Sequence, residues 1–297
     1  MMQTLLDPFA YAFFVKGVIV ATLAGGLCGL IGVYITLRGM SYIGHGLSHA
    51  IFGGFAASSI INLNYYLGAG VWGIASALAI NRVTRTRRIG ADAAIGVITT
   101  ASFALGIALL TIFGNKGPSF DAALFGSIIG VSVADVWALV AITAFTAVVI
   151  FCNYRQLLFA TFDPEVADVS GVPVARTDAL LMLVLSLSIL ATLTVIGVTL
   201  VAATLVIPAV IARMLTNRFS RMLWLSTAIG AMSGLVGMNL SYHLDVPSGT
   251  TIVLTGAAVF LVVLQVTGSK GLRRAAQLDS HPEPAPAAAL KGLPAAR

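Results

Sequence analysis

Two histidines four residues apart are the side chains in this sequence best suited to chemistry. His45 and His49 lie in a segment rich in small residues. On an α-helix this spacing places both imidazole rings on one face. Neutral imidazole is a common transition-metal ligand, so the pair predicts a place where a divalent ion is held. The alternative is a pair of histidines that only bond to backbone carbonyls where helices pack.

A metalloprotease is a further use for paired histidines, and the sequence excludes it. Such enzymes need a Glu directly after the first His, as in His-Glu-x-x-His. Here residue 46 is Gly, and the two glutamates, Glu165 and Glu283, lie outside every apolar run. The two cysteines, Cys28 and Cys152, lie within apolar runs and are interpreted as small packing residues.

The composition identifies the element type that must position the histidines. Of 297 residues, 58% are hydrophobic and 9% are charged, against about 25% charged in soluble domains. A chain of this kind is an all-α polytopic membrane protein, which excludes a soluble enzyme and a nucleic-acid-binding domain. A spanning helix needs about 20 apolar residues. Candidate spans lie near 14–37, 42–61, 64–80, 92–113, 131–152, 178–195, 197–213, 222–240 and 249–267.

Nine spans are therefore expected, and eight if the first run is interfacial. The runs 64–80 and 197–213 are short, and Gly197 and Pro208 interrupt the second, as in the broken helices of transport sites. Of the 17 Lys and Arg residues, 15 fall in alternate loops and the tail, leaving Lys16 and Lys116 on the other side. By the positive-inside rule the N-terminus is outside and the C-terminus is cytoplasmic.

The chain divides into a transmembrane domain, 1–274, and a Pro- and Ala-rich tail, 275–297, which is expected to be disordered and cytoplasmic. The longest internal loop is expected over 153–177. It contains Asp163, Pro164, Glu165, Asp168 and Gly171 in the order of a capped short helix. Such a helix is unstable alone. It either rests on the bundle or docks into a cytoplasmic partner.

Polar residues predicted to face outward form a third group: Asp121, His243 and Asp245. They are candidates for capturing a cation from outside, although loop polarity alone explains them equally well. The sequence also lacks a Gly-x4-Gly-Lys-Ser/Thr phosphate loop. The chain is therefore not expected to hydrolyse nucleotides itself.

Several blocks together resemble the permease subunits of bacterial zinc, manganese and iron ABC importers. They occur in the family's order between about residues 15 and 267. The blocks are Met40–Ala50, Asp92–Val97, Phe125–Ser132, Asp163–Glu165, Val201–Ala209 and Asp245–Gly249.

The resemblance implies an ABC importer permease fold in the bacterial cytoplasmic (inner) membrane and a homodimer. It also implies two cytoplasmic ATPase subunits and an extracytoplasmic metal-binding protein. Asp163 to Gly171 would be the coupling helix, and His45 and His49 would line the metal path with no permanently bound cofactor. The family often carries Asp at the position of His45. Imidazole in place of a hard carboxylate favours Zn(II) as cargo, with Mn(II) and Fe(II) as alternatives.

Three rival functions are compatible with a polytopic membrane protein. A proton-coupled carrier usually has acidic residues within its spans, whereas the Asp residues here lie near span ends. A permease for a bulky metal chelate, such as a siderophore or cobalamin, would not need histidines in the path. A scaffold without transport activity would leave the histidine pair and the capped helix unexplained.

Overall fold

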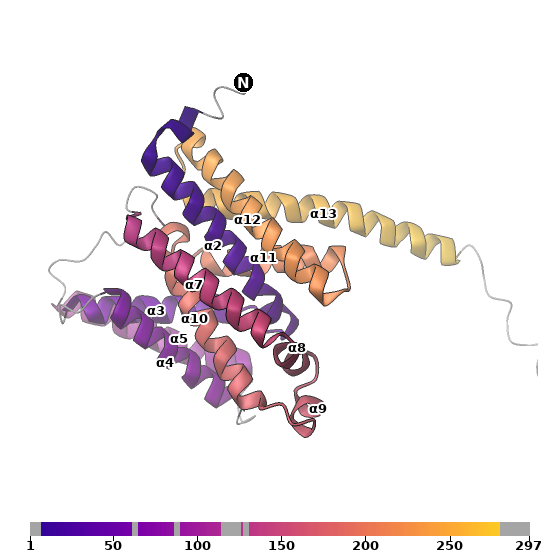
Figure 1. The fold of residues 1–297 in the computed structure, drawn as a ribbon, viewed down its shortest axis with the longest axis horizontal. Helices are drawn as coiled ribbons and strands as arrows, with labels where there is room; N and C mark the ends of the chain where they lie inside the picture. Colours follow the sequence, from indigo (N-terminus) through magenta and orange to yellow (C-terminus); the bar gives the residue numbers. More distant parts are fainter. Residues whose placement is uncertain (1–6, 61–64, 86–89, 114–125, 127–130, 280–297) are drawn as a thin grey trace, which may run out of the picture.

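The computed structural model describes residues 7–60, 65–85, 90–113, 126 and 131–279, and every regular element in them is a helix (Figure 1). The first part holds η1 (Asp7–Ala10), α2 (Ala12–Leu37), α3 (Ile43–Ile60), α4 (Tyr65–Arg85), α5 (Ala91–Phe113) and α7 (Val133–Cys152). The second part holds α8 (Tyr154–Phe162), α9 (Pro164–Val169), α10 (Val174–Ile196), α11 (Val201–Leu215), α12 (Phe219–Leu244) and α13 (Ser248–Asp279).

Each of the nine expected spans coincides with a helix in the described residues, which confirms the all-helical prediction. Six of these helices, α2, α5, α7, α10, α12 and α13, are long and apolar enough to cross a membrane. The helix α11 is apolar but shorter. α3 and α4 are not among the six. Gly, Ser and His lower the hydropathy of α3, and Asn81, Arg82 and Arg85 end α4. The count of nine spans therefore stays a prediction.

α2 is the central helix of the bundle. It is buried along most of its length and packs against α7, α10, α11 and α12. Its contact with α12 is close because glycines face each other there. A Cβ on Gly25 would collide with the carbonyl oxygen of Gly230. The Ser226 hydroxyl donates to the carbonyl oxygen of Gly29 at 2.6 Å. Small residues thus let the two backbones approach.

The helices α3, α4 and α5 form a second group, which lies side by side at one edge of the bundle in Figure 1. α3 packs against both α4 and α5, and α10 joins this group to α2. At the opposite edge α13 packs on α11 and α12, and its C-terminal part extends away from the other helices (Figure 1). The predicted start of the tail at 275 lies inside α13, and residues 280–297 lie outside the described residues.

The expectation of a loop over 153–177 was wrong in part, because α8 occupies its first third. Leu157, Ala160 and Thr161 are buried on one face of α8, at the spacing of an amphipathic helix. Nine residues are too few for a span, so the search for apolar windows of about 20 residues missed this helix.

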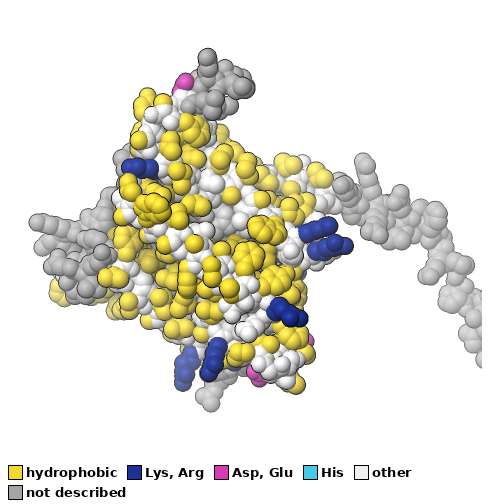
Figure 2. Space-filling view, in the orientation of Figure 1, with side chains coloured by type: hydrophobic (Ala, Val, Ile, Leu, Met, Phe, Trp, Pro, Cys, Tyr) yellow, Lys and Arg dark blue, Asp and Glu magenta, His cyan; other side chains and the backbone are white. Residues whose placement is uncertain are grey.

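Charged side chains are few on the face shown in Figure 2, and apolar side chains cover much of it. In this view the Lys and Arg atoms lie mainly toward the lower and right-hand ends of the bundle, with one group near the N-terminal end. Asp178 of α10 forms ion pairs with Arg38, which follows α2, and with Arg85 of α4. These helix ends therefore meet, as the predicted alternation of loops requires.

Candidate metal path and coupling helix

His45 and His49 lie on one face of α3, as their spacing predicts. Their ring centroids are 4.4 Å apart, with an angle of 52° between the ring planes. Both residues are half-buried, in a helix whose neighbouring positions are buried. Two imidazoles this close can ligate one ion together.

The hydrogen bond of His49 leaves one of its nitrogens free for a metal. The Nδ1 of His49 lies 2.9 Å from the carbonyl oxygen of His45. A carbonyl oxygen only accepts, so Nδ1 carries the proton in this bond. In the neutral ring the lone pair then lies on Nε2, the usual arrangement of a metal-ligating histidine. The backbone contact considered as an alternative is thus present, and it is compatible with ligation.

The helix α5 covers the histidine face of α3. The ring of Phe103 packs edge-on against His49, with centroids 4.8 Å apart. A Cβ on Gly46 would lie 2.7 Å from Cγ2 of Ile95, and one on Gly106 would lie 2.6 Å from the Cα of Gly53. The small residues around the pair therefore admit a neighbouring helix, as the sequence suggests.

The break between α10 and α11 lies next to the histidine pair. α10 ends at Gly197, whose φ is +84°, and α11 begins at Val201 and continues through Pro208. The hydroxyl oxygen of Ser48 lies 2.8 Å from the carbonyl oxygen of Val198 and 2.8 Å from that of His45. Gly197 thus interrupts the helices as predicted, whereas Pro208 does not.

Within the described part of the chain, no group of three or more His, Cys, Asp or Glu side chains could hold a metal ion. The histidine pair could therefore offer an ion two nitrogen ligands from the described residues. Few ligands suit an ion in transit, because binding must be weak enough for the ion to leave.

The residues proposed for outer capture are not brought together with the histidine pair. His243 and Asp245 are exposed at the end of α12, and Nδ1 of His243 lies 2.9 Å from the carbonyl oxygen of Asn239. Asp245 has a left-handed conformation, with φ of +53°, and ends the helix. Asp121 lies outside the described residues.

A polar contact that the sequence did not predict joins α4 and α7. The hydroxyl of Tyr66 donates to Oδ1 of Asp135 at 2.5 Å. The Oδ2 of Asp135 accepts from the backbone N–H and the hydroxyl of Ser132 in a capping box. The Ser-x-x-Asp spacing is a local signal for the cap. No local pattern predicts the contact with Tyr66, which lies 69 residues from Asp135 in the chain.

The predicted short helix is present as α9. The Asp163 carboxylate accepts from the Val166 N–H at 3.0 Å, and Pro164 is the first helical residue. Gly171, with φ of +85°, donates to the carbonyl of Asp168, and Val172 donates to that of Ala167. These two bonds form a Schellman motif. Both caps therefore agree with the sequence analysis.

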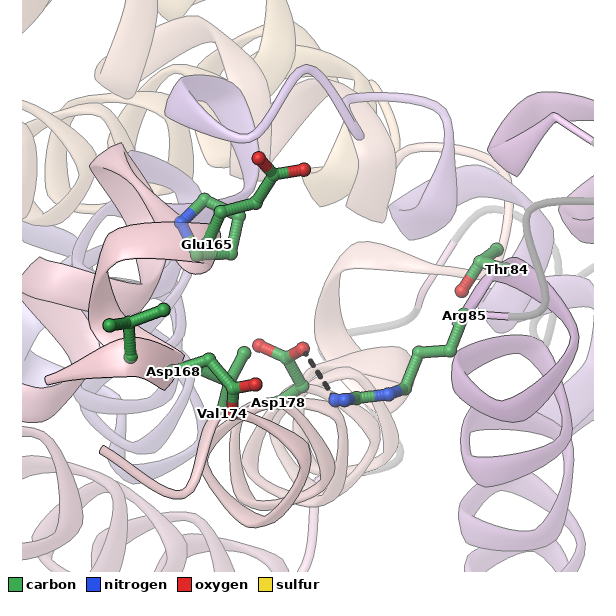
Figure 3. A pocket seen from close by; sticks show the side chains of 8 residues that line it. Thr84, Arg85, Glu165, Asp168, Val174 and Asp178 are labelled. Atoms are coloured by element: carbon green, nitrogen blue, oxygen red, sulfur yellow. Dashed lines mark hydrogen bonds and ion pairs between the residues drawn. The ribbon is translucent and has the colours of Figure 1, made fainter. Parts of the chain in front are cut away.

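An open cavity of about 410 Å³ separates α9 from the ends of α4 and α10 (Figure 3). Its wall includes Glu165 and Asp168 from α9, Asp178 from α10 and Arg85 from α4. In Figure 3 the Arg85 guanidinium extends across the cavity to Asp178. Most residues of α9 are exposed, so α9 and this cavity are accessible to a partner.

The six long apolar helices in the described residues indicate a multi-pass membrane protein, and the histidine pair is its candidate metal site. The chain belongs to the ABC 3 transport family, which it matches over residues 10–267. It is 38% identical to the "Manganese transport system membrane protein MntC" of Halalkalibacterium halodurans, over 89% of this chain and 90% of the relative. It is 31% identical to the "Chelated iron transport system membrane protein YfeD" of Yersinia pestis, over 87% of this chain and 86% of the relative.

A solved structure also resembles this chain over most of its length. The chain is similar to a chain of "PsaBC from Streptococcus pneumoniae in complex with Fab", with a TM-score of 0.80 and 32% identity. The match covers 89% of this chain and 95% of that chain. The protein is thus a permease subunit of the metal-ion ABC importers, as the motifs predict, and not a proton-coupled carrier.

Proposed function

We propose that this chain provides the membrane path of an ATP-driven importer for a bare divalent transition-metal ion, with His45 and His49 as the ligands in the path. The pairing of two imidazoles 4.4 Å apart on α3 carries this proposal. The ion enters from outside, is held briefly by the two rings and leaves to the cytoplasm.

Zn(II) is the cargo that the donor set favours. Two imidazole nitrogens suit borderline metals such as zinc better than manganese, which prefers carboxylates. Mn(II) is the second candidate, because a relative with 38% identity is named for manganese transport. A chelated-iron cargo has some support, because a relative with 31% identity is named for chelated iron transport. A chelate would not need the two histidines.

ATP hydrolysis takes place in separate cytoplasmic ATPase subunits, and an extracytoplasmic binding protein delivers the metal. α9 is the coupling helix: Asp163, Pro164 and Gly171 hold its shape, while Glu165 and Asp168 face the ATPase. His243, Asp245 and Asp121 assist capture at the outer mouth. The permease acts as a homodimer in the bacterial inner membrane. Family membership supports the ATPase and binding-protein partners, and the exposed position of α9 supports its coupling role.

Nine spans are proposed, with the N-terminus outside and the C-terminus cytoplasmic. α3 and α4 complete the count with α11 and the six strongly apolar helices. The polar residues of α3 and α4 fit helices that line a path and pack against each other, because only the surface of a helix that faces lipid must be apolar.

The test is metal uptake by proteoliposomes that hold this chain with the ATPase and binding protein from the same genome. Zn(II), Mn(II) and Fe(II) are offered separately, with and without ATP. ATP-dependent accumulation of at least one bare ion supports the proposal, and the rank order identifies the cargo. Uptake of a chelate alone, with no bare ion accumulated, would overturn it.

A further inference from the structure

A partly buried arginine at the end of α2 contacts two other elements of the bundle. The side chain of Arg38 is 11% exposed, and its Nη1 lies 2.6 Å from Oδ1 of Asp178 in α10. Its Nε donates to the hydroxyl of Thr161 in α8 at 3.2 Å. One guanidinium therefore connects the ends of α2, α8 and α10.

The connection to α8 leads directly to the coupling helix. Thr161 lies two residues before Asp163, the N-cap of α9. The Thr161 hydroxyl also donates to the carbonyl of Leu157 at 2.6 Å, which fixes its rotamer. Any displacement of the α8–α9 segment therefore moves an acceptor of Arg38.

The connection to the metal path runs through a rigid turn. Arg38 caps α2, and Gly39 follows with φ of +68°. Gly39 donates to the carbonyl of Thr36, and Met40 donates to that of Ile35, which is a second Schellman motif. Ile43 then begins α3. The short turn between Arg38 and α3 leaves little slack, so the positions of Arg38 and His45 are linked.

Burial makes this arginine depend on its partners. A guanidinium removed from water is destabilising unless it is paired and hydrogen-bonded. Asp178 supplies the negative charge but also pairs with Arg85. Nη1 of Arg85 lies 3.3 Å from Oδ2 of Asp178, and the Arg85 side chain is 41% exposed. Nη2 of Arg38 is buried without a hydrogen-bond partner in the described structure. The partly buried Arg38–Asp178 ion pair thus lies beside the more exposed Arg85–Asp178 pair, which faces the cavity of Figure 3. Within the described residues, Nη2 of Arg38 is an unused donor.

We propose that Arg38 is the positioning residue that transmits movement of the α8–α9 segment to α3 and so to the histidine pair. This inference rests on the proposed function, since it assigns a route between the coupling helix and the metal path. Arg38 does not touch the ion. Its forked guanidinium holds Thr161 and Asp178 together, which a single ammonium group cannot do in the same way.

Two substitutions remove the Thr161 contact and retain the ion pair. Arg38→Lys keeps the positive charge beside Asp178, and Thr161→Val keeps the volume at residue 161. Each is reconstituted as the full complex with ATPase and binding protein, and ions imported per ATP hydrolysed are measured. We expect this ratio to fall at least fivefold in both variants, with unchanged assembly. We expect the double variant to be no worse than either single one, because both changes remove the same contact.

Arg176→Lys is the matched control, because Arg176 is an exposed arginine in the first turn of α10. It should keep the wild-type ratio. A wild-type ratio in Arg38→Lys or Thr161→Val, or a loss of assembly in place of a changed ratio, would overturn the inference while the proposed function stands. A wild-type complex without ATP-dependent uptake would overturn the proposed function and this inference with it.

Discussion

The Nδ1 nitrogen of His49 is hydrogen-bonded to the carbonyl oxygen of His45, at 2.9 Å, within one helix. The backbone of the first histidine thereby orients the ring of the second. Nε2 of His49 then carries the lone pair that could bind a metal, and the ring of His45 lies 4.4 Å away. The local fold of α3 therefore orients the two rings that we propose as metal ligands.

Replacing His45 by Asp should change the choice of metal. A carboxylate is a harder ligand than imidazole and favours Mn(II) relative to Zn(II). The backbone carbonyl of residue 45 remains, so the bond that orients His49 is retained. We expect His45→Asp to raise the ratio of manganese to zinc uptake at least about tenfold, a change of about 1.4 kcal/mol. Competition between the two ions in proteoliposomes measures the ratio.

Tyr42→Phe is the control for that experiment. The Tyr42 ring lies 5.6 Å from that of His45, and phenylalanine keeps the ring. Its metal ratio should equal that of the wild type. An unchanged ratio in His45→Asp would show that His45 does not contact the ion.

Close packing of α3 on α5 should make Gly53 intolerant of a side chain. A Cβ at this position would collide with the carbonyl oxygen of Ser102. Overpacking of this kind costs about 1–3 kcal/mol. We expect Gly53→Ala to lower the melting temperature in detergent and to reduce uptake by displacing the histidine helix from α5.

Gly96→Ala on α5 is the matched control, because no atom lies within 4 Å of a Cβ there. Alanine is also the better helix former, so its melting temperature should equal or slightly exceed that of the wild type. Equal melting temperatures for Gly53→Ala and Gly96→Ala would contradict the close approach of the two helices.

The C-terminal cap of α9 should be needed for docking to the ATPase. Gly171 has φ of +85° and open space around it, so Gly171→Ala adds backbone strain but no collision. That strain costs roughly 1–2 kcal/mol. We expect weaker recovery of the ATPase subunits in pull-downs at limiting concentration. Gly268→Ala, with open space and no positive φ, should recover them normally. Equal recovery by the two variants would remove α9 from the docking surface.

The sequence predicted much of the fold because membrane spans leave long apolar runs, and each run coincides with a helix. It also predicted both caps of α9, since Asp-Pro and Gly are local signals. It missed α8, whose amphipathic pattern is only nine residues long. It could not predict the Arg38–Asp178 ion pair, because pairing across 140 residues depends on how helices pack and leaves no local pattern. The histidine pair was visible because both ligands share one helix.

The number of spans gives a topological prediction. Nine spans place the two termini on opposite sides of the membrane, and eight place them on the same side. We expect an N-terminal epitope to be accessible to antibody in intact spheroplasts. A C-terminal epitope should become accessible only after lysis. Equal accessibility of both epitopes would contradict nine spans.

Transport through His49 is the most direct test of the metal path. ATP-dependent uptake of the preferred ion is compared between His49→Ala and His281→Ala, the same substitution in the C-terminal tail. We expect His49→Ala to lose at least about tenfold in uptake, because one of the two ligands is removed, while its complex with the ATPase assembles normally. His281→Ala should transport at the wild-type rate. Wild-type uptake by His49→Ala would contradict a metal path through the histidine pair.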